Sequence, residues 1–219
     1  SESCELKNAR MIRRSFAGIS FLLSSAASAS AFSVDPVKMA SFPPTFHLTK
    51  AMKGPDVAKH LVLGEEAKGA SIVCIDPDAP HGCDSGQSNF GWLHWYVTSL
   101  TPGEEPDPKC HRGEHLITLS TGSHKWKGCE VVTYAPPTPP QGFHRYEFFM
   151  LPAGTTLPLS SWGLSSDSRK TRADIITDVH QKGGGVPFAA FGCTKSTAAN
   201  AQCVKSDQFP AGCQYTATA

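Results

Sequence analysis

The chain runs Ile72-Val73-Cys74-Ile75-Asp76-Pro77-Asp78-Ala79-Pro80 through its most informative stretch. The four apolar residues predict a buried β-strand, which Pro77 ends because proline lacks the backbone donor that a sheet needs. Pro77 also holds Asp76 in an extended conformation. Two carboxylates therefore leave one strand end on a stiff loop. Aspartates often cap ordinary turns, but two rigidly placed carboxylates are more than a turn requires.

Further strands are expected along the chain, and helices are few. Period-2 alternation in 93–100 predicts a strand with Leu93, Trp95 and Val97 on one face and His94, Tyr96 and Thr98 on the other. The other expected strands cover residues 115–120, 130–134 and 145–151. One helix is expected, capped by Asp167 or Ser168, with an apolar stripe from Ala173 to Val179 and an end at Gly183-Gly184-Gly185. The expected class is mostly β.

Two more segments combine polar residues with apolar strands. Trp92-Leu93-His94-Trp95 places a histidine among aromatics, which favours a partly apolar pocket, although a single strand histidine is most often an ordinary core or surface residue. In 134–146, a proline-stiffened loop leads to His144-Arg145-Tyr146. His144 and Tyr146 share one face of a regular strand, and Arg145 points to the other. Arg145 is therefore expected to pair with a carboxylate, either Asp76 or Asp78.

These three motifs, in this order and spacing, resemble the signature of the phosphatidylethanolamine-binding protein family, which includes the Raf kinase inhibitor protein and plant flowering regulators. The resemblance covers 72–151 and extends weakly to 185–191. It implies a large antiparallel sheet packed on a smaller sheet, with a few peripheral helices. It also implies a surface pocket for the phosphatidylethanolamine headgroup or other small phosphate or carboxylate anions. The residues expected to bind the ligand or shape the rim are Asp76, Asp78, His94, His144, Tyr146, Pro80, Trp92 and Pro136.

The sequence departs from the animal and plant members in several places. Ala135 stands where glycine is common, and the tail lacks the C-terminal helix with a pocket-facing tyrosine, for which Tyr215 is no convincing substitute. The short proline-rich lead-in to His144 is more similar to that of bacterial and archaeal relatives. Kinase inhibition and flowering-type signalling therefore do not follow from the resemblance alone.

These residues are compatible with three functions. The first is non-enzymatic binding of a phospholipid headgroup or small anion, with modulation of an unidentified partner protein, a kinase or a protease. The second is protease or kinase inhibition by a secreted protein through the loop 101–111. The third is a metal-dependent hydrolase with Asp76, His94 and His144 as ligands. It is ranked lowest because the histidines lack the close spacing of helical zinc motifs. No cofactor or metal is expected, and the absence of a Gly-x-Ser-x-Gly elbow argues against serine hydrolysis.

Composition excludes several other classes. The 219 residues are 40% apolar and 18% charged, which fits one globular domain with tails. The net charge of +1 gives no general attraction for nucleic acid or anionic membranes, so an anion must be held by a local site. No nucleic-acid partner and no transmembrane segment are expected. The protein is expected to be a monomer.

The two ends of the chain differ from its middle. Residues 1–31 are expected to be a leader, with a basic stretch, a short apolar run and the A-x-A-like Ala29-Ser30-Ala31; the domain follows over 32–193, and 194–219 form a cysteine-bearing tail. The leader indicates the secretory pathway or, alternatively, a plastid. Eight cysteines favour an oxidising compartment, with Cys74 the expected buried free thiol and the pairing of the others open.

Overall fold

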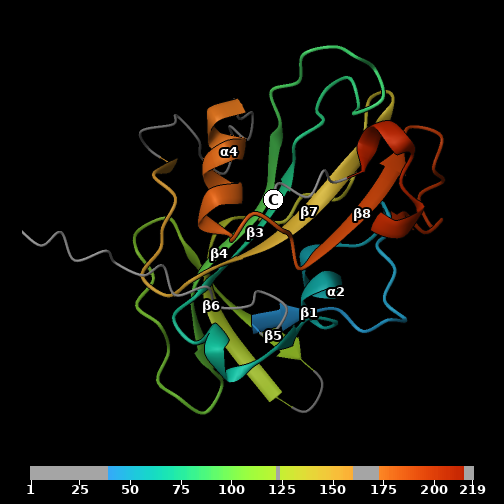
Figure 1. Cartoon of the computed structure of the whole chain (residues 1–219). Coiled ribbons are helices and arrows are strands. Elements are labelled where there is room, and N and C mark those ends of the chain that lie inside the picture. Colours follow the sequence, from blue (N-terminus) through green and yellow to red (C-terminus); the bar gives the residue numbers. More distant parts are fainter. Residues whose placement is uncertain (1–38, 122–123, 160–172, 215–219) are drawn as a thin grey trace, which may run out of the picture. The chain divides into compact units, whose positions relative to one another are not determined.

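A seven-stranded antiparallel sheet forms the centre of the fold. Its strands are β3 (Ser71–Asp76), β4 (Trp92–Pro102), β5 (His115–Thr121), β6 (His124–Val132), β7 (Phe143–Leu151), β8 (Ala189–Thr194) and β9 (Val204–Lys205). They are ordered β5-β6-β4-β3-β7-β8-β9, and Figure 1 labels the strands from β3 to β8. A second, two-stranded sheet pairs β1 (Ala40–Ser41) with β2 (Val62–Leu63). The predicted architecture of a large antiparallel sheet, a smaller sheet and few helices is confirmed.

The computed structural model describes residues 39–121, 124–159 and 173–214. The expected leader, residues 1–31, lies outside the described residues, and so do both candidate helix caps and Tyr215. Within the described residues, no helix has the length and apolar character that a membrane crossing requires.

The strands of the large sheet lie where the sequence predicted them, with two differences, and β1 and β2 of the small sheet were not predicted. β6 starts at His124, six residues before the expected strand at 130–134, and ends at Val132. β8 and β9 were not predicted, because β9 has only two residues and β8 contains Gly192, which weakens a strand pattern. Gly192 is required there, since an added Cβ would collide with the ring of Phe143. The ring of Phe143 occupies the space that a side chain at position 192 of β8 would fill.

Both faces of the large sheet are covered. On one face lie β1, β2 and helix α2 (Gly54–Ala58), whose buried residues join one core cluster with Cys74 and Phe148. On the other face, helix α4 (Ala173–Lys182) packs Ile175 and Val179 against β3 and β7. Strands covered on two sides need apolar residues at successive positions, which explains the unbroken apolar run of β3.

Helix α4 also makes a polar contact with the sheet. The predicted end of this helix before Gly183-Gly184-Gly185 is confirmed, since α4 ends at Lys182. His180 in its last turn forms a hydrogen bond of 2.8 Å with Glu147, a fully buried carboxylate on β7. One carboxylate oxygen of Glu147, Oε2, therefore has a hydrogen-bond partner on the helix side of the sheet.

Three disulfides connect different elements within the described part of the chain. They join Cys83 to Cys213, Cys110 to Cys129, and Cys193 to Cys203. The prediction that Cys74 is a buried free thiol is confirmed, and burial raises the pKa of this thiol, which keeps it protonated. Since Cys203 and Cys213 are bonded to cysteines of the domain, the described part of the tail, up to residue 214, is attached to the domain.

The disulfides are expected to differ in their effect on stability. In the chain-entropy model, loss of the Cys83–Cys213 bond, which closes a loop of 130 residues, costs ~5 kcal/mol, whereas loss of the Cys193–Cys203 bond, with a separation of 10, costs ~3 kcal/mol. Urea unfolding of the Cys83→Ser/Cys213→Ser and Cys193→Ser/Cys203→Ser variants measures both. Equal losses, or peptide mapping that shows different pairs, would contradict this account.

Candidate functional site

The Asp76–Asp78 loop begins the site at the end of β3. The backbone N–H of Asp78 donates to Asp76 Oδ1 at 2.8 Å, so Asp76 does cap a turn as the simplest interpretation of the sequence proposed. Its other oxygen, Oδ2, is bonded to His144 Nδ1 at 2.7 Å. Both side chains are almost completely buried. Asp76 is therefore part of a turn and also one half of a buried Asp–His pair.

The second aspartate is bound by Arg145. The guanidinium of Arg145 donates from Nε to Asp78 Oδ2 and from Nη2 to Oδ1, each at 2.8 Å. The backbone N–H of Arg145 donates to Oδ2 as well, at 2.9 Å. The sequence left open whether Arg145 pairs with Asp76 or with Asp78, and the structure identifies Asp78. This bidentate pair attaches the loop to β7.

A β-bulge in β4 determines where His94 points. Cys74 pairs with Trp95 and the next residue of β3, Ile75, pairs with Leu93, so His94 is an extra residue between two ladder positions. The predicted alternation is therefore wrong at Leu93 and at His94. Leu93 packs with Ile75 and Tyr96 on the α4 face, whereas His94 and Trp95 are on the opposite face. The extra residue turns His94 toward the same cavity as Asp76.

The proline-rich segment 133–142 forms a wall beside His94. Ala135 accepts a hydrogen bond from His94 Nδ1 at 2.8 Å, and its own N–H donates to the backbone carbonyl of His94, also at 2.8 Å. Since a carbonyl only accepts, the proton of His94 must be on Nδ1, which leaves Nε2 on the side away from Ala135. Gly142 ends the segment with a positive φ of 66° at a close approach to the carbonyl of His81, a position that excludes a side chain.

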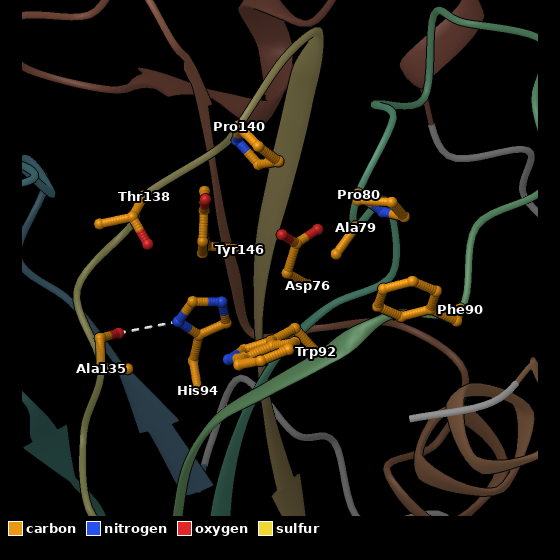
Figure 2. A pocket seen from close by; sticks show the side chains of 10 residues that line it. All are labelled: Asp76, Ala79, Pro80, Phe90, Trp92, His94, Ala135, Thr138, Pro140 and Tyr146. Carbon is orange, nitrogen blue, oxygen red and sulfur yellow. Dashed lines mark hydrogen bonds between the residues drawn. The ribbon is translucent and has the colours of Figure 1, made fainter. Parts of the chain in front are cut away.

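These elements enclose a cavity of about 490 Å³. Figure 2 shows Asp76, His94 and Tyr146, from three different strands, pointing into one space. The rings of His94 and Tyr146 meet edge to face with centroids 5.0 Å apart. The other lining residues are Ala79, Pro80, Phe90, Trp92, Ala135, Thr138 and Pro140. A site of this size with three convergent polar groups on aromatic walls is typical of small-molecule pockets.

Five of the eight predicted site residues line this cavity: Asp76, Pro80, Trp92, His94 and Tyr146. The other three lie next to it. Asp78 is turned toward Arg145, His144 is behind Asp76, and Pro136 lines a different cavity on the far side of the wall. Asp78 and His144 are outside the cavity for the same reason. Each is buried in an ion pair between β7 and the loop that follows β3 or the end of β3 itself, Asp78 with Arg145 and His144 with Asp76.

Burial changes the titration of the polar groups. It raises the pKa of Asp76 to about 6, although the hydrogen bond from His144 acts to lower it. Burial lowers the pKa of His144, but the hydrogen bond and charge of Asp76 more than offset this, so the pKa of His144 is raised. Burial also raises the pKa of Tyr146, which keeps its hydroxyl a donor. The cavity therefore combines a neutral phenol with a carboxylate that releases its proton near neutral pH.

Sequence reasoning missed five lining residues: Ala79, Phe90, Ala135, Thr138 and Pro140. Three of them belong to the proline-rich segment, whose stiffness was recognised and could have marked the whole segment as a wall. Phe90 carries no local signal, because it lies in an irregular loop and reaches the cavity only through the path of that loop.

The predicted metal ligands do not form a cluster. Within the described part of the chain, one group of potential ligands is close enough to share an ion, namely Cys110, Glu114 and Cys129. Cys110 and Cys129 are bonded to each other as a disulfide, which removes both thiolates. The set of Asp76, His94 and His144 is not among such groups.

The Arg145–Asp78 pair is expected to stabilise the fold without contacting the ligand. Arg145→Met leaves a buried carboxylate without its partner, which should lower the free energy of unfolding by about 3–5 kcal/mol, measured by urea denaturation. The control is Lys59→Met, which breaks the exposed pair with Asp56 and should cost less than about 1 kcal/mol. Equal losses in the two variants would refute this role of Arg145.

Known proteins share this sequence pattern. A family model described as phosphatidylethanolamine-binding protein matches residues 27–185. A UPF0098 protein of Methanothermobacter thermautotrophicus is 31% identical over 47% of this chain and 62% of its own length. The CEN-like protein 4 of Nicotiana tabacum is 30% identical, and the protein SELF-PRUNING of Solanum lycopersicum 29%, each over 59% of this chain and 61% of its own length. The chain thus spans about three fifths of these relatives.

The match to the family model covers most of the chain and includes all three motifs that build the cavity. The fold agrees with it, since a large antiparallel sheet and a small sheet are both present. This chain belongs to the phosphatidylethanolamine-binding protein family.

Proposed function

We propose that this protein binds the phosphoethanolamine headgroup of a phospholipid, or a chemically similar small phosphate, and is not an enzyme. The observation that supports the proposal is the convergence of Asp76, His94 and Tyr146 in one cavity. A zwitterionic headgroup requires donors for its phosphate and an acceptor for its ammonium. These three side chains provide both kinds of group within one pocket.

The phosphate is proposed to bind between His94 and Tyr146. His94 Nδ1 is committed to the Ala135 carbonyl, so protonation of this ring adds a donor at Nε2. Figure 2 shows the two rings at the same side of the cavity. A hydrogen bond from a charged imidazole to phosphate is stronger than one between neutral groups. Tyr146 adds a neutral donor through its hydroxyl.

The ammonium is proposed to lie toward Asp76 and the aromatic rings of Trp92 and Phe90. An ionised carboxylate accepts hydrogen bonds from an ammonium group, and the faces of aromatic rings attract cations at short range. Both rings line the cavity, and Figure 2 shows Phe90 on the side of Asp76 and the indole of Trp92 between His94 and Phe90. In this arrangement a nearly neutral chain holds a zwitterion without a basic surface.

The remaining predicted residues are proposed to act indirectly. His144 orients Asp76 and shares its proton, Asp78 anchors the loop through Arg145, and Pro136 stiffens the wall behind Ala135. Modulation of a partner protein is part of the proposal, and the partner is left unnamed. Three disulfides are typical of oxidising compartments, which supports a location in the secretory pathway.

Calorimetric titration with phosphoethanolamine tests the proposal. The wild-type protein should show saturable binding, and His94→Gln should weaken it about 10- to 100-fold because a charge-assisted hydrogen bond is lost. Tyr146→Phe removes only the hydroxyl and should weaken binding about 2- to 10-fold. His115→Ala, at an exposed position on β5 away from the cavity, is the matched control. Absence of saturable binding, or equal binding by His94→Gln and the wild type, rejects the proposal.

Binding of a simple phosphate anion should weaken as the pH rises. Above about pH 6 the Asp76–His144 pair loses a proton, which adds one negative charge beside the cavity and repels an anion. Dimethyl phosphate is a suitable probe because a diester lacks the second ionisation of phosphate monoesters near pH 6. Its affinity should fall about tenfold between pH 5 and 8. Asp76→Asn should flatten this profile, and an unchanged profile in that variant would disprove the assignment.

A further inference from the structure

A second cavity, of about 430 Å³, lies on the other side of the wall formed by the proline-rich segment. Its lining residues include Ala58, Trp95, Ile117, Glu130, Tyr134 and Pro136. They come from α2, from three neighbouring strands of the large sheet and from the segment 133–142. This volume falls within the range of ligand-binding pockets.

The two cavities share a wall that is one chain thick. Ala135 lines the first cavity, whereas its neighbours Tyr134 and Pro136 line the second. On β4 the bulge produces the same division, since His94 lines the first cavity and Trp95 the second. Adjacent strands lie about 5 Å apart, so a wall of one extended chain separates the two spaces by a similar distance.

The second cavity differs from the first in chemistry. Trp95 and Tyr134 meet edge to face in it, with centroids 5.8 Å apart, and Ala58, Ile117 and Pro136 add aliphatic surface. The acidic residue in the lining, Glu130, already accepts hydrogen bonds from Trp95 Nε1 at 2.8 Å and from the N–H of Tyr134 at 3.4 Å. Lys53, which is exposed, also belongs to the lining. The interior therefore suits an apolar chain better than a second polar group.

We propose that the second cavity binds an acyl chain of the lipid whose phosphate-bearing headgroup occupies the first. The proposal rests on the proposed function and extends it from a headgroup to an amphiphile. Two neighbouring cavities, one with convergent donors and one apolar, match the two parts of a phospholipid. We assign both cavities to a single lipid, because Ala135 lines one cavity and its chain neighbours Tyr134 and Pro136 line the other.

Calorimetry with the full chain and a series of soluble ligands tests the inference. The series comprises phosphoethanolamine and lysophosphatidylethanolamines with chains of six, eight and ten carbons, each below its micellar concentration. Once the chain is long enough to pass the wall, each further buried methylene should increase affinity about fourfold. Phosphoethanolamine itself reports on the first cavity alone.

Matched variants identify where the chain binds. Ile117→Glu places a charge in the second cavity, whereas Leu116→Glu places the same charge on the preceding residue, which is 48% exposed and does not line the cavity. Because Ile117 packs on the core, Thr133→Trp is a second variant that fills the cavity from an exposed position. Thermal unfolding of each variant establishes that it is folded.

The outcomes separate this inference from the proposed function. Support requires that Ile117→Glu and Thr133→Trp abolish the gain from chain length, that Leu116→Glu keeps it, and that all three bind phosphoethanolamine like the wild type. A lysolipid brominated near its chain end should also quench fluorescence in the wild type and less in Trp95→Phe. Unchanged headgroup binding with no gain from chain length, or a gain that survives both cavity variants, overturns the inference alone. Failure of phosphoethanolamine to bind overturns both.

Discussion

Two neighbouring residues of β7 hold the Asp-Pro-Asp loop against the sheet, and the rest of the site depends on this attachment. His144 and Arg145 project to different sides of the strand, and each binds one of the two carboxylates. Because buried carboxylates are unfavourable without partners, these two contacts stabilise the observed position of the loop. The pairing of β3 with β7 thereby determines where Asp76 enters the cavity. The need of the two buried carboxylates for partners thus fixes the position of the loop.

The cavity forms where the sheet departs from regular geometry. In a regular β4, His94 and Trp95 would point to opposite faces, and the histidine would face helix α4. The bulge at His94 instead brings both side chains to one face, on two sides of the proline-rich wall. Bulges often occur next to functional sites for this reason, since one extra residue re-aims a side chain without breaking the sheet.

Stiffness of the wall connects the two cavities in the structure. Proline restricts the backbone, and the two hydrogen bonds between Ala135 and His94 attach the segment to the bulged strand. A displacement of this segment would change the position of Ala135 in one cavity and of Pro136 in the other. The separation of a polar space from an apolar one therefore depends on a short length of chain with little conformational freedom.

Local sequence determined much of this protein. The apolar run at 72–75 predicted β3, and the aromatic and aliphatic residues of 145–151 predicted β7. The three motifs predicted five residues that line the cavity, and Cys74 was correctly expected to be a free thiol. These features depend on residue type, periodicity and the backbone limits of proline, all of which are visible over a few positions.

Tertiary structure alone decided the rest. The bulge at His94 exists only relative to its partner strand, so alternation along β4 could not reveal it. The choice of Asp78 rather than Asp76 as the partner of Arg145, the pairing of six cysteines and the contribution of Phe90 to the cavity likewise depend on contacts between distant segments. The glycine at position 192 of β8 likewise depends on tertiary structure, because the ring of Phe143 from β7 occupies the space that a side chain would need. A single sequence specifies local preferences, whereas register and long-range packing arise only when the whole chain has folded.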